Sequence, residues 1–389
     1  MFRKISFLFF LLATLRSGAQ IPRPLHVVVV ILENKNYHDI IDSAAAPYIN
    51  WLAHDSHTAF FSNSFATHHP SQPNYLALYS GSNQGITTNV RPDSLPFKTP
   101  NLGASLLQKG FSFVGYSEDL PFAGSDTELT ATYARRHNPW VNWQNSPVNG
   151  IPPECNQPLS AFPTDFNQLP EVAFIVPNNK NNMHDGADPL RIQRGDQWVH
   201  DHFDCYVQWA KSHNSVFILT FDEDDYDTVA NHVVTYFLGQ RVVKGTYPQT
   251  INHYSVLATI ETMFHLPLAG LSDSMPPVLT CWKRGHVDTF TTSSVYNNQS
   301  FVVHPNPLGS YGFFTINSPL LSDSLPLQII LYDALGRDVS TLLLASPPMP
   351  MCGQMQVAIN RRELSSAFYI FILKNGDSEI GRGKLVVAP

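Results

Sequence analysis

The chain has 389 residues, which exceeds one domain of usual size and favours one large domain with a smaller one. A composition of 43% hydrophobic and 14% charged residues argues against a largely disordered chain. The formal net charge of -7 gives no long-range attraction to nucleic acids, so we expect no nucleic-acid partner.

The first residues have the pattern of an export signal. Basic residues at positions 3 and 4 precede an apolar run over residues 5–15, and small residues follow up to Ala19. We therefore expect a signal peptide over residues 1–19 and a secreted or cell-surface protein. The apolar run is too short to span a bilayer as a permanent helix.

Four cysteines could form disulfides after export, with three possible pairings. They are Cys155, Cys205, Cys281 and Cys352. Buried free thiols fit the sequence equally well. No two cysteines have the CxxC spacing of a zinc or redox site, so we assign them no catalytic role.

Three almost continuous apolar runs predict strands that are buried on both faces, as in a parallel sheet. They cover residues 25–32, 172–177 and 215–221. Apolar residues at helical spacing predict helices over residues 193–213 and 254–264. This alternation predicts an α/β fold with a doubly wound, mainly parallel sheet sandwiched by helices.

Polar side chains follow each predicted strand, at the edge where open α/β sheets bind ligands. The first strand is followed by Glu33 and Asn34, and the third by Asp222 and Glu223. Carboxylate and amide oxygens are hard ligands, which suit calcium, magnesium or manganese, and zinc also accepts carboxylates. We expect the acidic residues at positions 224, 225 and 227 to form a solvated turn.

Ser71 stands in the string HPSQPNYLALYSG, just before a segment of helical character. Its hydroxyl is therefore expected at a helix N-terminus, where backbone N–H groups favour an anion such as a phosphoryl group. Because a serine hydroxyl is a weak nucleophile, it needs a base or a metal ion to activate it. The alternative is that Ser71 simply caps the helix.

Several histidines lie beside the predicted strand ends. An imidazolium can hold phosphate oxygens and protonate a leaving alkoxide. We rank His184 first and His232 second as candidates for this role. His253 and His69 come third, and His68 comes last.

The chain divides into segments of different character. We predict a catalytic domain over residues 22–286, with long loops at 92–100 and 139–165 that shape the rim of its pocket. A polar linker covers residues 287–300. Short alternating strands then predict a C-terminal β-sandwich over residues 301–389.

Seven motifs in order are similar to those of the bacterial phosphoesterase family that includes acid phosphatases and non-haemolytic phospholipases C. That family belongs to the alkaline-phosphatase-like superfamily. The resemblance covers residues 25–264 and implies an α/β sandwich fold and a phospho-serine intermediate. The motifs are ILENKNY, HPSQPNYLALYSG, NNMHDG, GDQWV, TFDEDD, NHVVTYFLG and NHYSVLATIE.

The resemblance also implies roles for particular residues. Ser71 would be the nucleophile, His184 would contact the phosphoryl group, and His69 and His232 would complete the catalytic set. Asparagines at positions 181 and 182 stand where acidic residues are frequent in the superfamily, so we expect one divalent metal ion rather than two. Its ligands would be Glu33, Asn34, Ser71, Asp222 and Glu223.

The end of the chain resembles the C-terminal sorting domain of the type IX secretion system. The resemblance rests on a PNP opening at residues 305–307, a D-x-x-G-R turn at residues 333–337 and the aromatic pair Phe368-Tyr369. It implies that the secretion machinery is a partner and that this domain serves export rather than chemistry.

The leading functional hypothesis is a secreted phosphomonoesterase that acts on a small phosphate ester. A phospholipase C-like phosphodiesterase that cleaves a phospholipid head group is the alternative within enzymes. A non-catalytic, surface-displayed binding protein is the alternative outside enzymes.

Overall fold

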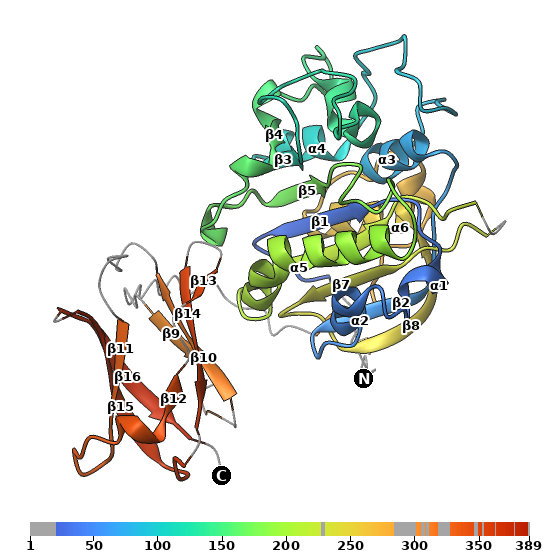
Figure 1. Ribbon diagram of the computed structural model, residues 1–389. Helices are drawn as coiled ribbons and strands as arrows, with labels where there is room; N and C mark the ends of the chain where they lie inside the picture. The colour runs from blue at the N-terminus through green and yellow to red at the C-terminus, as the bar shows by residue number, and fades with distance from the viewer. Residues whose placement is uncertain are drawn as a thin grey trace, which may run out of the picture. The chain divides into compact units, whose positions relative to one another are not determined.

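The chain folds into two compact units in a computed structural model (Figure 1). The first unit comprises Met1–Pro163 with Asn167–Val287, and the second comprises Thr164–Phe166 with Asp288–Pro389. The predicted signal peptide, the predicted linker and the PNP opening lie outside the residues that the structure describes. The described residues are 21–226, 230–283, 301–304, 308, 311–317, 327–345, 349–351, 354–361, 363–376 and 378–387.

The first unit is built on an eight-stranded sheet with the order β4-β3-β5-β1-β6-β7-β2-β8. Every neighbouring pair is parallel except the two that involve β7, which runs antiparallel to β6 and β2. The predicted mainly parallel sheet is therefore confirmed. The strands are β1 (Val27–Leu32), β2 (Thr58–Phe65), β3 (Phe113–Ser117), β4 (Asn156–Pro158), β5 (Val172–Val176), β6 (Val216–Phe221), β7 (Thr235–Gly239) and β8 (Gly245–Asn252).

Helices cover both faces of this sheet, because β1 and its neighbours are apolar on both sides. Val27, Val29 and Ile31 of β1 share one core with α3, α4 and α6, whereas α2 and α5 pack against each other and against β2, β6 and β7. Two predicted helices are confirmed as α5 and α6, with slightly different ends. The helices are α1 (Tyr37–Ile40), α2 (Pro47–Ala53), α3 (Ser71–Ser80), α4 (Leu102–Gln108), α5 (Leu190–Ala210) and α6 (His253–Met263).

The segment 139–165 is more structured than the predicted loop. It contributes the edge strand β4, which pairs with β3, and three 3-10 turns: η2 (Pro139–Trp143), η3 (Pro153–Cys155) and η4 (Leu159–Ala161). The physical reason is burial of aromatic surface, since the Trp140 and Trp143 side chains are fully buried and pack on Tyr79.

The second unit is a β-sandwich, as predicted. One sheet has the order β12-β14-β10-β9 with β13 paired to β14, and the other has the order β11-β15-β16. The two sheets share one core, in which the rings of Phe314 and Phe371 lie 4.7 Å apart. The strands are β9 (Phe301–His304), β10 (Tyr311–Asn317), β11 (Leu327–Tyr332), β12 (Leu344–Ala345), β13 (Met349–Met351), β14 (Gln354–Asn360), β15 (Phe368–Asn375) and β16 (Ser378–Val386).

Two of the four cysteines, Cys155 and Cys281, are buried free thiols. Burial raises the pKa of Cys155 to about 11 and that of Cys281 to about 12, so both thiols stay protonated and unreactive at neutral pH. Of the helices that the structure describes, none combines the length and the apolar character needed to cross a bilayer.

A buried carboxyl group anchors the short turn η6 (Gly270–Ser274) to α6. Glu261 accepts hydrogen bonds from the Ala269 backbone N–H at 3.0 Å and from the Ser272 hydroxyl at 2.6 Å. Burial nevertheless raises the pKa of Glu261 from 4.5 to about 7, because the two bonds only partly offset the loss of hydration.

This raised pKa predicts a pH-dependent loss of stability. Between pH 4.5 and about 7 the folded state retains a proton on Glu261 that the unfolded state releases, so the free energy of unfolding falls as pH rises through this window. Glu261→Gln, which stays neutral, should abolish that part of the fall, on the order of 2–3 kcal/mol. Urea unfolding at pH 5 and pH 8 measures it, with the exposed Glu154→Gln as control. Equal pH slopes in the parent and Glu261→Gln would contradict the assignment.

Candidate active site

The register of the central strands brings the first acidic residues together. β1 and β6 pair in parallel with Leu32 opposite Phe221, so Glu33 and Asp222 follow at the same carboxyl edge of the sheet. The Asp222 backbone N–H donates to the Leu32 carbonyl at 3.0 Å, which adds one backbone hydrogen bond between these two segments of the chain beyond the end of β6. The sheet itself therefore places these two side chains side by side.

Ser71 is the first residue of α3 and is buried, with its hydroxyl directed at carboxylates. Its Oγ donates to Glu223 Oε1 at 2.9 Å and lies 3.3 Å from Glu33 Oε2. The predicted position at a helix N-terminus is confirmed. The structure thus joins Ser71 to one acidic residue from the end of β1 and one from the end of β6.

Backbone groups fix the carboxylate of Asp222. Its Oδ1 accepts hydrogen bonds from the backbone N–H groups of Glu223 at 2.7 Å and Asn34 at 3.1 Å. Asn34 adopts a left-handed conformation with φ 43°, which asparagine tolerates better than most residues. This conformation turns the chain after β1 so that the Asn34 N–H reaches Asp222.

The buried carboxylates raise the cost of one another's ionisation. Burial raises the pKa of Asp222 well above its usual range, and the charges of Glu33 and Glu223 add to this. Burial also raises the pKa of Glu223, to about 8, against the opposing effect of the Ser71 hydrogen bond. A cation placed between these oxygens would relieve the repulsion.

The oxygens of the expected metal ligands fit such a cation. Glu33 Oε1, Asn34 Oδ1 and Asp222 Oδ2 are buried and have no hydrogen-bond partner among the described residues. Unsatisfied hard oxygens are what calcium, magnesium or manganese requires. No group of three or more His, Cys, Asp or Glu side chains in the described ranges has the arrangement of a metal site. The fit therefore depends on the amide and hydroxyl oxygens of Asn34 and Ser71 as well.

Two of the candidate histidines lie at this cluster. His69 Nδ1 is 2.5 Å from Glu223 Oε2, its Nε2 is 3.3 Å from Asp224 Oδ1, and its ring stacks on Tyr226. His184 is part-exposed, with Nδ1 2.8 Å from Asp185 Oδ1, and it adds a smaller effect to that of His137 in lowering the pKa of Glu33 against burial.

The other three candidate histidines contact backbone carbonyls or a hydroxyl group instead of the carboxylates of the cluster. His232 Nε2 lies 2.9 Å from the Ser62 carbonyl, and His68 Nδ1 lies 2.8 Å from Thr67 Oγ1. His253 Nε2 is 2.6 Å from the Asp222 carbonyl, and burial lowers the pKa of His253 to about 4, so its ring is a neutral donor. In the described part of the chain none of the three forms a hydrogen bond or ion pair with the Ser71 side chain.

The first acidic residue after Glu223 does not lie in the predicted solvated turn. Asp224 is fully buried and contacts His69. Asp225 forms ion pairs with Lys35 at 3.2 Å and Arg191 at 2.8 Å. For Asp224 the prediction is wrong, because His69 from another segment contacts the carboxylate and offsets part of the cost of removing it from water, whereas the Asp225 side chain remains 37% exposed. Asp227 lies outside the described residues.

His137 and Tyr75 belong to the site but were not identified from the sequence. His137 ends the short turn η1 (Arg135–His137), is buried, and places Nε2 at 3.0 Å from Glu33 Oε1. Its ring stacks on Tyr75, with 5.2 Å between centroids. Burial lowers the pKa of His137 against the opposing charge of Glu33, and its Nε2 makes no hydrogen bond to the described residues. No strand or periodic helix precedes His137, and its local sequence carries no signal for this contact.

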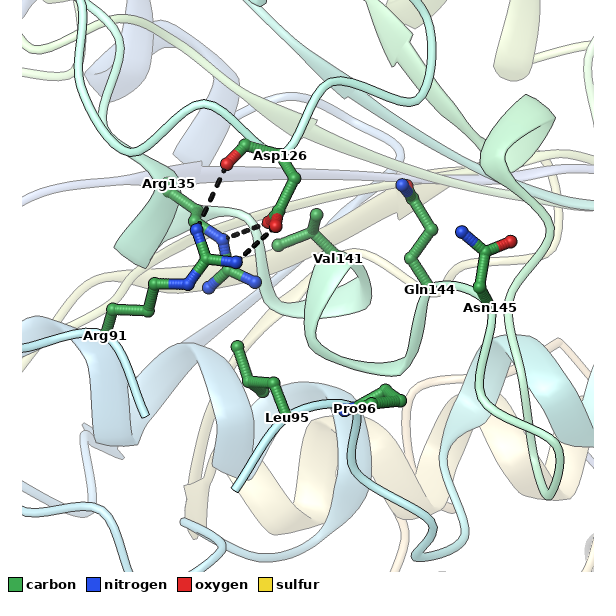
Figure 2. A pocket seen from close by; sticks show the side chains of 8 residues that line it. All are labelled: Arg91, Leu95, Pro96, Asp126, Arg135, Val141, Gln144 and Asn145. Carbon is green, nitrogen blue, oxygen red and sulfur yellow. Dashed lines mark hydrogen bonds and ion pairs between the residues drawn. The ribbon is translucent and has the colours of Figure 1, made fainter. Parts of the chain in front are cut away.

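A cavity of about 300 Å³ lies in the segments expected to form the rim (Figure 2). Arg91 and Arg135 both form ion pairs with Asp126 there, the latter at 2.6 Å between Nε and Oδ1. Gln72 Nε2, one residue after Ser71, donates to the Val90 carbonyl at 2.9 Å. The cavity wall is therefore tied to the start of α3. Its lining residues are Arg91, Leu95, Pro96, Asp126, Arg135, Val141, Gln144 and Asn145.

Replacing the partner of Glu33 should destabilise the protein. His137→Leu replaces the imidazole that lies 3.0 Å from Glu33 Oε1 by an apolar side chain next to this buried carboxylate, which should cost about 1–3 kcal/mol in the free energy of unfolding. The exposed His54→Leu should change this free energy by no more than about 0.5 kcal/mol. Urea unfolding of the three proteins measures the difference, and a His137→Leu protein as stable as His54→Leu would refute the contact.

Residues 41–267 match the Phosphoesterase family. A phosphatidylinositol-3-phosphatase of Mycobacterium tuberculosis is 42% identical over 268 residues, which cover 68% of this chain and 85% of that protein. A probable acid phosphatase of Kluyveromyces lactis is 32% identical, covering 64% of this chain and 61% of that protein.

Among solved structures, a protein in the alkaline phosphatase superfamily from Vibrio parahaemolyticus is 10% identical with a TM-score of 0.43, covering 82% of each chain. A likeness at this level says nothing about activity. The chain belongs to the phosphoesterase family and is a phosphoric ester hydrolase.

Proposed function

We propose that the protein is an exported, metal-dependent phosphomonoesterase in which Ser71 is the nucleophile and carries the phosphoryl group in an intermediate. The position of the Ser71 hydroxyl supports this most directly. It lies at the N-terminus of α3, 2.9 Å from Glu223 and 3.3 Å from Glu33. A helix N-terminus favours the charge that the phosphoryl group would bring to Ser71.

The protein's own groups orient the reaction in this proposal. Glu223 accepts a hydrogen bond from the Ser71 hydroxyl and so fixes the direction of the Oγ lone pairs. His69 holds the second oxygen of Glu223, and backbone N–H groups hold Asp222. His184, the part-exposed histidine, is available to contact the phosphoryl group and to protonate the leaving alkoxide.

A divalent metal ion would be held by Glu33, Asn34, Ser71, Asp222 and Glu223. Unpartnered oxygens on three of these residues support this ligand set. When bound, the ion would lower the pKa of the Ser71 hydroxyl and neutralise charge on the phosphoryl oxygens. The oxygen ligands suit calcium, magnesium or manganese, and zinc is compatible with them.

The names of the relatives favour a phosphomonoester as substrate. One is a phosphatidylinositol-3-phosphatase, and others are acid phosphatases. We therefore propose small phosphate monoesters as substrates, with a phosphorylated inositol lipid as a further candidate. Hydrolysis of p-nitrophenyl phosphorylcholine but not of p-nitrophenyl phosphate would reverse this choice in favour of a phosphodiesterase.

Loss of the nucleophile and loss of a metal ligand should have different effects. Ser71→Ala should reduce hydrolysis of p-nitrophenyl phosphate by at least about 1,000-fold and leave metal content unchanged or only lowered in part. Asp222→Ala should reduce both the metal content and the rate. The double variant should lose little beyond the slower single variant, because the two groups act together. Metal analysis and steady-state rates measure these effects.

Several outcomes would contradict the mechanism. If the Ser71→Ala protein bound metal and hydrolysed the substrate at the parent rate, a metal-bound water and not Ser71 would be the nucleophile. Losses that add fully in the double variant would show that Ser71 and Asp222 act independently.

We further propose that the C-terminal β-sandwich directs export. Its D-x-x-G-R segment forms a tight turn, in which Arg337 Nε donates to Asp333 Oδ2 at 2.7 Å and Gly336 has φ 77°. The aromatic residue Phe368 begins β15. These features agree with the sorting-domain motifs, and the first unit alone contains the proposed catalytic residues.

Deletion of residues 288–389 should therefore separate export from catalysis. We expect the truncated protein to keep phosphatase activity within about twofold of the parent, because the second unit provides none of the proposed site residues. In its native host the truncated protein should fail to reach the cell surface. Cell fractionation and p-nitrophenyl phosphate hydrolysis measure the two effects, and a folded but inactive truncation would contradict the division.

A further inference from the structure

Arg136 is a cation without an ion-pair partner among the described residues, whereas each of its two neighbours in the chain has a charged group close by. It is the middle residue of η1, where Arg135 donates to Asp126 and His137 lies 3.0 Å from Glu33. Arg136 has no carboxylate within ion-pair distance among the described residues, and its Nε is buried without a hydrogen-bond partner there. A buried donor left unpaired is costly, so this geometry suggests a partner that arrives with the substrate.

The neighbours of Arg136 place its charge at the active site. η1 packs against α3, the helix that begins at Ser71. Burial raises the pKa of Tyr75 and lowers that of His137, and the Arg136 guanidinium lowers both values. Its charge is therefore close to both rings, each of which adjoins the Glu33 carboxylate.

Other cations near the acidic residues are already paired. Lys35 is buried between Asp225 at 3.2 Å and Asp188 at 3.5 Å. Arg191 binds the same two carboxylates, each at 2.8 Å. An incoming phosphate ester meets several carboxylates, so it requires a positive charge that the protein has not already neutralised. Arg136 is such a charge, and a guanidinium matches phosphate oxygens with two parallel donors.

We infer that Arg136 binds the non-bridging oxygens of the substrate's phosphoryl group and selects phosphomonoesters over phosphodiesters. This inference rests on the proposed function at Ser71. A monoester near neutral pH carries close to two negative charges and three terminal oxygens. A diester carries one charge and two terminal oxygens, and its second ester group replaces an oxygen that a guanidinium could bind. The fixed charge of Arg136 therefore stabilises the bound monoester more.

The test compares two substrates that share a leaving group, p-nitrophenyl phosphate and methyl p-nitrophenyl phosphate. Arg136→Gln should lower kcat/KM for the monoester by about 10- to 100-fold and change that for the diester by less than about threefold. The inhibition constant of inorganic phosphate should rise by a similar factor of about 10 or more. Arg382→Gln is the control, since its guanidinium is exposed and paired with Glu379 in the second unit, and it should retain the parent ratio of the two substrates.

A second variant keeps the test decisive if Arg136→Gln does not fold. Arg136→Lys retains the charge but not the planar fork, so it should show an intermediate loss on the monoester and little change on the diester. Equal losses on both substrates, or unchanged inhibition by phosphate, would overturn the inference. The proposed function is tested by different results. It would be wrong if the parent protein did not hydrolyse p-nitrophenyl phosphate or if the Ser71→Ala protein still did.

Discussion

The burial of several carboxylates at one point of the sheet edge is the constraint on which the rest of the site depends. Glu33, Asp222 and Glu223 are almost fully removed from water, so burial and the neighbouring carboxylates raise the pKa values of Asp222 and Glu223, whereas His137 lowers the pKa of Glu33 against its burial. The surrounding groups act against this cost: backbone N–H groups bind Asp222, Ser71 donates to Glu223, and His137 lies beside Glu33. The remaining unpartnered oxygens mark where a cation would complete the balance.

The fold supplies this constraint through its order of strands. β1 lies between β5 and β6 in the middle of the sheet, so the residues that follow it are covered from both sides. Around the buried carboxylates, a second set of charges is paired internally, with Lys35 and Arg191 sharing Asp188 and Asp225. This outer set fixes the chain segments after β1 and β6 relative to α5. It leaves the inner carboxylates without a competing lysine or arginine partner among the described residues.

The sequence predicted the parts of this arrangement that depend on local pattern. Apolar β-branched runs indicated β1, β5 and β6, and parallel strands bring their carboxyl ends together, so Glu33 and Asp222 could be expected to meet. His137 could not be found in this way, since its contact with Glu33 joins residues 104 positions apart through an irregular turn. The burial of Asp224 was not predicted for the same reason, because its contact His69 belongs to another segment of the chain.

Burial also decides which side chains can carry positive charge in the site. It lowers the pKa of His253 to about 4, so this ring is a neutral donor to the Asp222 backbone carbonyl, and it also lowers the pKa of His137 beside Glu33. A guanidinium resists such neutralisation far better, because its pKa starts above about 12. In the proposed mechanism, recognition of an anionic ester therefore falls to fixed charges and to groups with more access to water, while the buried His253 holds the backbone of Asp222 in place.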